Sequence, residues 1–350
     1  MNIMVLGYNL KTRYDASQYY LIKQLAEMGN VILYGLERLP QRLVPISYFS
    51  SLPLFPKIDH KIGTLRLGLR RKLRSAHVIE DIAKVAQEES SEVILMENVF
   101  PLATQWKTLN QVKIPKALIV TDFHRDPKKL LKYIEESHID LVLFGYKQWL
   151  NIPRVKKWIR RKKVSAKWLP HCANTKVFRD YGLPRRFDVV SSGRCSQKVY
   201  PLRVAIRDTL SSTSDIRFSM PKHAAYELAK GKSPSEVLVF ENYAKFLSQA
   251  KIFIFGSSIY NYALMKYTEG MACNTLVMAP MPMDGKDLHF VPGENFVEVN
   301  RSNFVEKIRY YLKHDNERCQ IALRGMQTVE KYHTVQKRAN QLITYLKSIC

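Results

Sequence analysis

The sequence has few cysteines and lacks the short motifs that open well-known nucleotide and metal sites. Its five cysteines are scattered without a C-x-x-C pair, which excludes a disulfide framework and favours a reducing compartment. No G-x-G-x-x-G follows the first apolar run, which argues against a dehydrogenase, and no G-x-x-x-x-G-K-[ST] loop occurs. None of the nine histidines belongs to an H-x-x-x-H or carboxylate-rich cluster, so no metal site is expected.

The chain also lacks a long uncharged run. The longest one, residues 252–265, is too short and too polar to span a bilayer. The N-terminus begins as a short apolar strand without a basic leader or a cleavage site. We therefore expect a cytoplasmic protein, either free or bound peripherally to the inner face of the membrane.

Acidic residues are scarce relative to basic ones. Aspartate and glutamate total 31 against 55 lysines and arginines, which gives a formal net charge of +24. Such a field attracts polyanions, namely nucleic acid, anionic lipid headgroups or phosphate-rich polymers. A generally basic proteome or a need for solubility would also explain the charge, so the partner stays open at this point.

Short apolar runs alternate with longer amphipathic segments along most of the chain. Strands are expected at residues 3–6, 31–34, 93–96, 117–120, 141–144, 188–191, 216–218, 252–255, 275–278 and 296–299. Several intervening segments have helical spacing, for example residues 16–28 and 126–136, and the chain is helical after residue 303. This alternation predicts an α/β protein with parallel sheets and crossover helices.

An irregular, proline-containing stretch divides the pattern into two blocks. We expect an N-terminal Rossmann-like domain at residues 1–170, a linker at 171–186 and a second Rossmann-like domain at 187–350, whose last helix is free to pack back on the first. Ligands of open parallel sheets bind beyond the carboxyl ends of the strands. Two facing domains would therefore form one cleft.

The segment NYALMKYTEGMACNTLVMAP, residues 261–280, contains the most informative pair of charges. Lys266 and Glu269 are three residues apart near the start of an expected helix, so they share one face. A carboxylate there can accept both hydroxyls of a ribose, and the cation can meet a phosphate. An ordinary exposed ion pair on a helix would have the same spacing.

The same segment resembles the donor-site helix of two-domain glycosyltransferases with the GT-B fold. In that family an acid followed by small residues and an apolar strand holds the ribose of the nucleotide sugar, and Glu269 matches this acid. The stretch SSGRCSQKVYPLR, residues 191–203, is similar to the family's G-R-x-x-x-K segment. The resemblance implies that Arg194 and Lys198, which follow Gly193, grip the diphosphate, with Arg203 as a reserve cation.

Two further motifs extend the resemblance over most of residues 165–340. WLPHCANTKVF, residues 168–178, is similar to the family's interdomain signature W-x-P-x-G-x-D-x-x-x-F, with Cys172 and Asn174 replacing the usual glycine and aspartate. FVPGENFVEV and the later HTVQKR resemble the C-terminal end of the spore-maturation-protein branch. One departure concerns stereochemistry: retaining families have a second acid at the position of Asn261, so retention is in doubt.

In the N-terminal half, Asp122 and His124 directly follow an expected strand in ALIVTDFHRDP, residues 117–127. An inverting transfer needs a base for the acceptor hydroxyl, and either residue type can serve. The segment resembles the T-D-x-R-x-P loop of phage DNA β-glucosyltransferase, where the aspartate is the base. Alternatively, Asp122 is the N-cap of the following helix, and His124 contacts the transferred sugar or solvent.

Residues 141–179 contain no acid and have a dense basic cluster at their centre. Val155, Trp158 and Ile159 fall at helical spacing within it. This helix would pack its apolar stripe on the sheet, dock on anionic lipid, or follow a DNA backbone. A second basic run, RLGLRRKLR, occupies residues 66–74.

Taken together, the motifs predict a metal-independent glycosyltransferase without a cofactor, which uses a nucleoside-diphosphate sugar, most simply a UDP-sugar. Its acceptor would be attached to a polyanionic cell-envelope glycan or lipid. Phage-type glucosylation of hydroxymethylated DNA is one alternative. A non-catalytic, nucleic-acid-binding α/β protein is the other.

Overall fold

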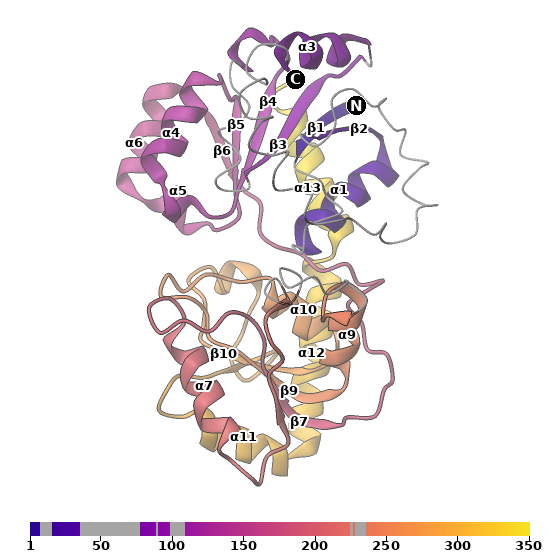
Figure 1. Ribbon diagram of the computed structural model, residues 1–350, viewed down its shortest axis with the longest axis vertical. Helices are drawn as coiled ribbons and strands as arrows, with labels where there is room; N and C mark the ends of the chain where they lie inside the picture. Colours follow the sequence, from indigo (N-terminus) through magenta and orange to yellow (C-terminus); the bar gives the residue numbers. More distant parts are fainter. Residues whose placement is uncertain (8–15, 36–77, 89, 99–108, 225–226, 228–235) are drawn as a thin grey trace. The chain divides into compact units, whose positions relative to one another are not determined.

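The computed structural model describes the chain apart from residues 8–15, 36–77, 89, 99–108, 225–226 and 228–235 (Figure 1). The basic run at 66–74 therefore lies outside the described residues. Internal contacts divide the chain into two units. The first comprises Met1–Arg13, Ile22–Pro170 and Ala339–Cys350, and the second comprises Tyr14–Leu21 and His171–Arg338.

The first unit contains a six-stranded parallel sheet in the order β2-β1-β3-β4-β5-β6. Its strands are β1 Asn2–Gly7, β2 Asn30–Gly35, β3 Val93–Asn98, β4 Lys116–Val120, β5 Leu141–Phe144 and β6 Ser165–Trp168. All residues of β4 and β5 are buried, as expected for central strands covered on both faces. The helical elements formed wholly or partly by this unit are α1 Ala16–Met28, α3 Val78–Glu88, η4 Leu109–Gln111, η5 Phe123–Arg125, α4 Pro127–Glu136, α5 Gln148–Asn151, α6 Pro153–Lys162 and α13 Val335–Lys347.

The second unit contains a five-stranded parallel sheet in the order β11-β10-β9-β7-β8. Its strands are β7 Phe187–Val190, β8 Phe218–Ser219, β9 Ala250–Ile254, β10 Leu276–Ala279 and β11 Val297–Glu298. The helices formed by this unit are α7 Pro201–Ser211, α9 Phe240–Ser248, α10 Lys266–Ala272, η7 Lys286–Leu288, α11 Phe304–Lys313 and α12 Asp315–Tyr332. Two parallel sheets with flanking helices confirm the predicted α/β class.

Alternate residues of each strand in the second sheet point to opposite faces, where they pack against different helices. On one face, Ile252 and Ile254 share a core cluster with residues of α7 and α11. On the other face, Phe253 contacts α10, where a Cβ added to Gly270 would lie 2.6 Å from its ring. Glycine therefore allows α10 to approach the sheet closely, which fixes the height of this helix over the strands.

Each of the ten expected strands corresponds to a strand of the structure, and the strand missed from sequence is β6. Its residues are half-buried or exposed and include Lys167, because β6 lies at the edge of the sheet. An edge strand needs no continuous apolar run, so the hydrophobic pattern did not identify it.

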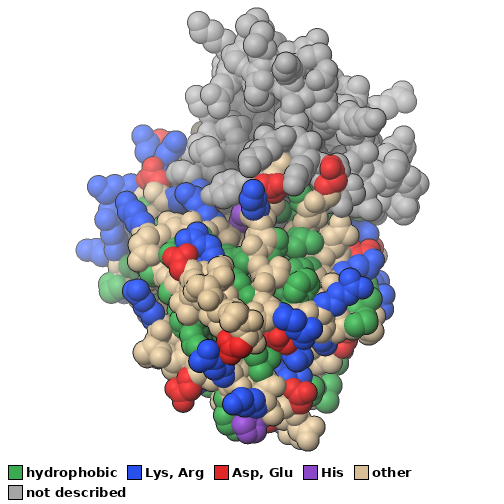
Figure 2. Space-filling view, turned by 60° about the horizontal axis from the view of Figure 1, so that its bottom comes forward, with side chains coloured by type: hydrophobic (Ala, Val, Ile, Leu, Met, Phe, Trp, Pro, Cys, Tyr) green, Lys and Arg blue, Asp and Glu red, His purple; other side chains and the backbone are tan. Residues whose placement is uncertain are grey.

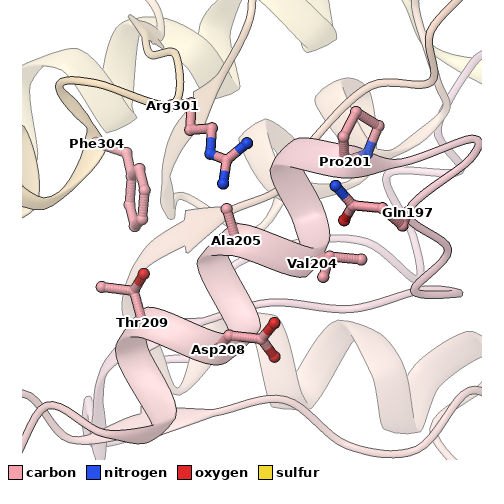
Figure 3. Close-up of a pocket in the computed structure, with 8 residues that line it drawn as sticks. All are labelled: Gln197, Pro201, Val204, Ala205, Asp208, Thr209, Arg301 and Phe304. Atoms are coloured by element: carbon pink, nitrogen blue, oxygen red, sulfur yellow. The ribbon is translucent and has the colours of Figure 1, made fainter.

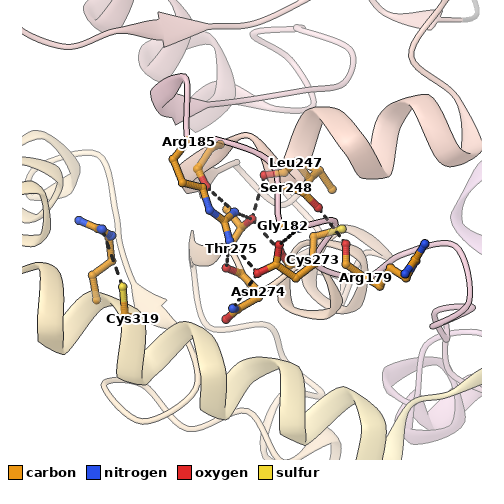
Figure 4. A network of polar contacts seen from close by, with 12 residues as sticks. Arg179, Gly182, Arg185, Leu247, Ser248, Cys273, Asn274, Thr275 and Cys319 are labelled. Carbon is orange, nitrogen blue, oxygen red and sulfur yellow. Dashed lines mark hydrogen bonds and ion pairs between the residues drawn. The ribbon is translucent and has the colours of Figure 1, made fainter.

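The segment that precedes β7 is fixed by a polar network at the amino ends of β9 and β10 (Figure 4). The Arg185 guanidinium donates to the carbonyls of Ala250 and Asn274, both at 2.9 Å, and contacts Asp180 at 3.2 Å. Thr275 accepts a further hydrogen bond from Arg185 at 3.2 Å. This network joins residues 180–185 to the sheet of the second unit.

Candidate functional site

A group of polar side chains lies at the carboxyl edge of the second sheet. After β7 come Ser192, Gly193 and Arg194, and after β9 comes Gly256. Because the strands are parallel, these segments leave the sheet at the same edge, where ligands of such sheets bind. Helix α10 contributes two more charges, described below.

Arg203 is the central scaffold of this edge. Its side chain reaches from α7, is only 2% exposed, and lies 4.0 Å from the centre of the Tyr200 ring. Nη1 donates to the Arg194 carbonyl at 2.9 Å and Nη2 donates to the Gly256 carbonyl at 2.7 Å. Arg203 thus joins the loops after β7 and β9, and its terminal nitrogens are already engaged.

Gly193 is the point where two cations converge. A Cβ built on this residue would lie 2.7 Å from Nη1 of Arg203 and 3.2 Å from Cε of Lys266. Its φ of +103° also lies in the region that glycine favours. Any side chain here would displace a cation, which explains why the position suits glycine.

Lys266, the first residue of α10, is held in place by two hydroxyls. Its Nζ donates to Ser192 Oγ at 2.7 Å and lies 3.4 Å from Tyr243 Oη, and those two hydroxyls are 2.7 Å apart. Burial and then the Arg203 charge hold the pKa of Lys266 well below its usual value, while Glu269 opposes that shift.

Glu269 lies one helical turn after Lys266 and is 4% exposed. The expected alternative of an ordinary exposed ion pair is therefore wrong, because the carboxylate is buried beside the cation cluster. Burying a charge is costly unless a partner or a ligand compensates for it. Burial raises the pKa of the Tyr243 hydroxyl, and the negative charge of Glu269 raises it further.

The other two predicted phosphate ligands are on the surface. Arg194 and Lys198 are both exposed, Arg194 directly after Gly193 and Lys198 in the turn before α7. The structure thus brings the buried Arg203 and Glu269 together with the half-buried Gly193 and Lys266, and it leaves Arg194 and Lys198 exposed.

Three residues of this site were missed from sequence: Ser192, Tyr243 and His223. His223 follows β8, and Arg194, Arg203 and Lys266 are close enough to affect its pKa. Its place just beyond an expected strand end is a signal that sequence could have provided. Ser192 and Tyr243 carry no such signal, because only the tertiary fold brings them to Lys266.

Asn261, which stands where retaining relatives have an acid, connects two loops of the structure. Its Oδ1 accepts from Ser257 Oγ at 2.9 Å, and its Nδ2 donates to the Met281 carbonyl at 2.7 Å. The residue also has φ of +51°, which asparagine tolerates better than most residues. A carboxylate here could not donate to Met281, so asparagine suits this connection.

In the first unit, Asp122 and His124 lie directly beyond β4, at the carboxyl edge of that sheet. Asp122 forms an ion pair with Arg125 at 2.8 Å and makes no capping hydrogen bond. Asp126 instead caps α4, accepting from the Lys129 amide at 3.0 Å, so Asp122 does not cap α4. Burial lowers the pKa of the half-buried His124. The negative charge of Asp122 opposes this lowering, and the positive charge of Arg125 adds to it.

The basic segment forms α6, and the apolar stripe of this helix faces the interior of the first unit. Val155 and Trp158 are 3% and 7% exposed, and Trp158 donates to Glu135 of α4 at 2.5 Å. The apolar side is therefore used within the first unit and is not available for insertion into a membrane. Its exposed cations are Arg154, Lys156, Lys157, Arg160, Arg161, Lys162 and Lys163, with Lys167 in β6.

Basic side chains are not confined to α6. Lys and Arg are spread over the face shown in Figure 2, with Asp and Glu between them. Within the described part of the chain, no group of three or more His, Cys, Asp and Glu side chains is arranged to hold a metal ion. Over the same residues, no helix is long and apolar enough to cross a membrane.

A separate cavity of about 240 Å³ lies beside α7 (Figure 3). Ala205 and Asp208 of α7 line it, together with Arg301 and Phe304. Small-molecule sites usually need about 300 Å³ or more. This cavity is therefore too small for a nucleotide sugar and does not compete with the group around Gly193.

Comparisons with known proteins bear on both halves of the chain. Residues 222–344 match the family model described as Glycosyl transferase-like. No curated protein sequence matches significantly. HepE from Anabaena in complex with UDP is similar in structure at 12% identity, over 99% of this chain and 100% of that chain, with a TM-score of 0.65. HepE has also been solved with UDP-glucose.

Two further solved structures share the architecture over almost the whole chain. Sucrose-phosphate synthase from Thermosynechococcus elongatus is 14% identical over 99% of both chains, with a TM-score of 0.62. A glycosyltransferase from Rickettsia africae is 13% identical over 99% of this chain and 98% of that one, with a TM-score of 0.61. At such identities the likeness establishes the fold.

Proposed function

We propose that this chain, a glycosyltransferase of the GT-B type, transfers a sugar from a UDP-sugar to an acceptor on a polyanionic envelope surface. The observation that carries the proposal is the buried Glu269 beside the cations around Gly193, at the carboxyl edge of the second sheet. HepE, which shares the fold, was solved with UDP and with UDP-glucose. This combination of site chemistry and fold supports the proposed donor class.

Each residue of the donor site has a proposed role. Glu269 accepts hydrogen bonds from the ribose hydroxyls. Lys266, Arg194 and Lys198 neutralise the diphosphate as it leaves. Arg203 is a positioning residue, because its nitrogens hold the loops that carry Gly193 and Gly256.

The reaction is proposed to need no metal. A leaving diphosphate requires positive charge at the moment the glycosidic bond breaks, and preorganised cations can supply it. Lys266 is fixed by Ser192, so its charge needs little rearrangement during the reaction. Chelation by EDTA should therefore leave the rate unchanged.

We propose that residues 1–170, which belong to the first unit apart from residues 14–21, bind the acceptor, that residues 187–350 bind the donor and that residues 171–186 connect them. Asp122 would be the base if the reaction inverts, with His124 beside the transferred sugar. Asn261 supports inversion, since its amide is engaged and cannot act as a second acid. The exposed cations of α6 would attract the anionic acceptor surface by charge alone, at the inner face of the membrane.

Donor turnover is the direct test of the enzyme assignment. The protein is incubated with a panel of nucleotide sugars, with and without EDTA, and released nucleotide is measured. UDP release from one UDP-sugar, unaffected by EDTA, is expected. Release that requires an added divalent ion would contradict the metal-independent mechanism.

Retention on anionic vesicles and on duplex DNA, measured as salt rises, tests the acceptor surface. Vesicle binding that fades with salt is expected, because the apolar side of α6 is buried and only charge remains. Tight DNA binding with a steep salt dependence and no vesicle binding would favour glucosylation of DNA instead.

A further inference from the structure

His223 is a titratable side chain of the donor site that the roles above leave unused. It follows β8, and the end of β8 is joined to the end of β7 by the hydrogen bond from the Ser191 amide to the Ser219 carbonyl at 3.0 Å. Because the two strands are parallel neighbours, the segments after them emerge side by side. This topology places the half-buried His223 next to the loop that contains Gly193.

Positive charges face His223 from three other elements. Arg194 comes from the loop after β7, Arg203 from α7 and Lys266 from α10, and all three act electrostatically on the imidazole. On its own segment, Lys222 precedes it and the Glu227 amide donates to the His223 carbonyl at 3.4 Å. The surroundings of the ring are therefore strongly cationic before any ligand arrives.

We propose that His223 is an additional ligand of the donor diphosphate and takes up a proton when the nucleotide sugar binds. This inference rests on the proposed function, because it assigns a further residue to the same donor site. The diphosphate of a nucleotide sugar has two negative charges. Their arrival offsets most of the positive field at His223 and supplies an acceptor, so a group that was neutral in the empty site becomes a charged donor to a phosphate oxygen.

The direction of the pH dependence follows from these charges. In the empty site, burial, and then the charges of Lys266, Arg203 and Arg194, lower the pKa of His223. The bound diphosphate raises that pKa. Donor affinity therefore increases as the pH falls from the bound pKa to the free pKa, and it stops increasing below the free value.

Calorimetry with UDP-glucose tests the proposal. Binding is measured at pH 7 in two buffers with different ionisation enthalpies, which gives the number of protons taken up. Neither phosphate of a nucleotide sugar titrates near neutral pH, so the uptake belongs to the protein. We expect more uptake by the wild type than by His223→Asn, in which Lys266, whose pKa is also lowered in the empty site, still gains protons. His223→Asn should also lose affinity by about tenfold at pH 6.

Two further variants control for charge and for structure. Lys222→Gln removes a neighbouring positive charge and should preserve the uptake. His223→Lys restores a permanent cation, so it should recover affinity at pH 8 and show no more uptake than His223→Asn. Thermal unfolding of each variant shows that the fold is kept.

The outcomes separate this inference from the proposed function. If UDP-glucose and other UDP-sugars fail to bind the wild type, the donor assignment is wrong and the role of His223 falls with it. If a UDP-sugar binds without proton uptake, or if His223→Asn takes up as many protons as the wild type, the donor assignment stands and the role of His223 is refuted.

Discussion

The carboxyl edges of the two sheets carry functional candidates of opposite character. In the second unit, Glu269 and Arg203 are 4% and 2% exposed, and hydrogen bonds to loop carbonyls fix the guanidinium. In the first unit, the side chains of Asp122 and Arg125 are 36% and 53% exposed and contact each other. One edge is assembled before a ligand arrives, whereas the other offers charges that solvent still reaches.

This difference suits the two substrates of a sugar transfer. A nucleotide diphosphate has a constant shape and charge, so a rigid site lowers the cost of binding it. Acceptors differ in shape, and an exposed carboxylate can meet a hydroxyl in many contexts. Changes in the second unit should therefore affect donor affinity, and changes in the first unit should affect turnover.

Asp122→Asn is expected to have the largest effect. If Asp122 is the base, kcat should fall by about 100-fold to 10,000-fold while donor affinity is unchanged. The free energy of unfolding should change by less than about 1 kcal/mol, since the lost ion pair is largely exposed. Transfer kinetics and donor titration measure the two quantities separately.

Arg125→Gln is the matched control for that pair. It breaks the same contact but keeps the carboxylate, so kcat should change only a few-fold. An equal loss of kcat in both variants would show that the ion pair positions the loop and that Asp122 is not the base.

Glu269→Gln should weaken donor binding by about 100-fold, because a buried charged acceptor for two hydroxyls is worth about 3 kcal/mol. Since Glu269 is buried, the loss should hardly depend on salt. Glu241→Gln, which changes an exposed glutamate of α9, serves as the control and should bind normally. Full donor binding by Glu269→Gln would remove the ribose assignment.

The second unit should also lose stability in acid through His333. Its Nε2 donates to the Leu288 carbonyl at 2.8 Å, and burial lowers its pKa to about 4. In the unfolded chain a histidine has a pKa of about 6.5, so between pH 4 and 6.5 the unfolded chain binds more protons than the folded protein. Stability is therefore complete above pH ~6.5 and falls by at most about 3 kcal/mol as the pH drops towards 4.

Denaturant unfolding between pH 4 and 8 measures this slope. His333→Asn should flatten it, at the cost of lower stability at neutral pH. His314→Asn, which changes an exposed histidine of the same unit, should leave the slope as it is. If the wild type shows no such slope, His333 is not buried as a neutral ring.

The sequence predicted ten of the eleven described strands and singled out Lys266 and Glu269, but it did not predict the contacts that give the site its character. Central strands such as β9 have apolar residues on both faces, so their pattern is plain in the chain. Glu269 and Lys266 were singled out by their spacing within one helix together with the resemblance of that segment to a donor-site helix. Arg203 was expected as a reserve cation, whereas the structure engages it with backbone carbonyls from two loops. Such backbone partners are distant in sequence, so no local sequence pattern predicts them.

Lys198→Gln should have the smallest effect and the one that best distinguishes exposed from buried charges. Lys198 is exposed in the turn before α7, so its contribution to diphosphate binding is screened by solvent and salt. Donor affinity should fall by about threefold to tenfold at low salt, and the difference from wild type should nearly vanish at high salt. Lys313→Gln on α11 removes the same net charge and should bind like wild type. A salt-independent loss in Lys198→Gln would place this lysine in a closed site and remove the distinction between the exposed and the buried cations.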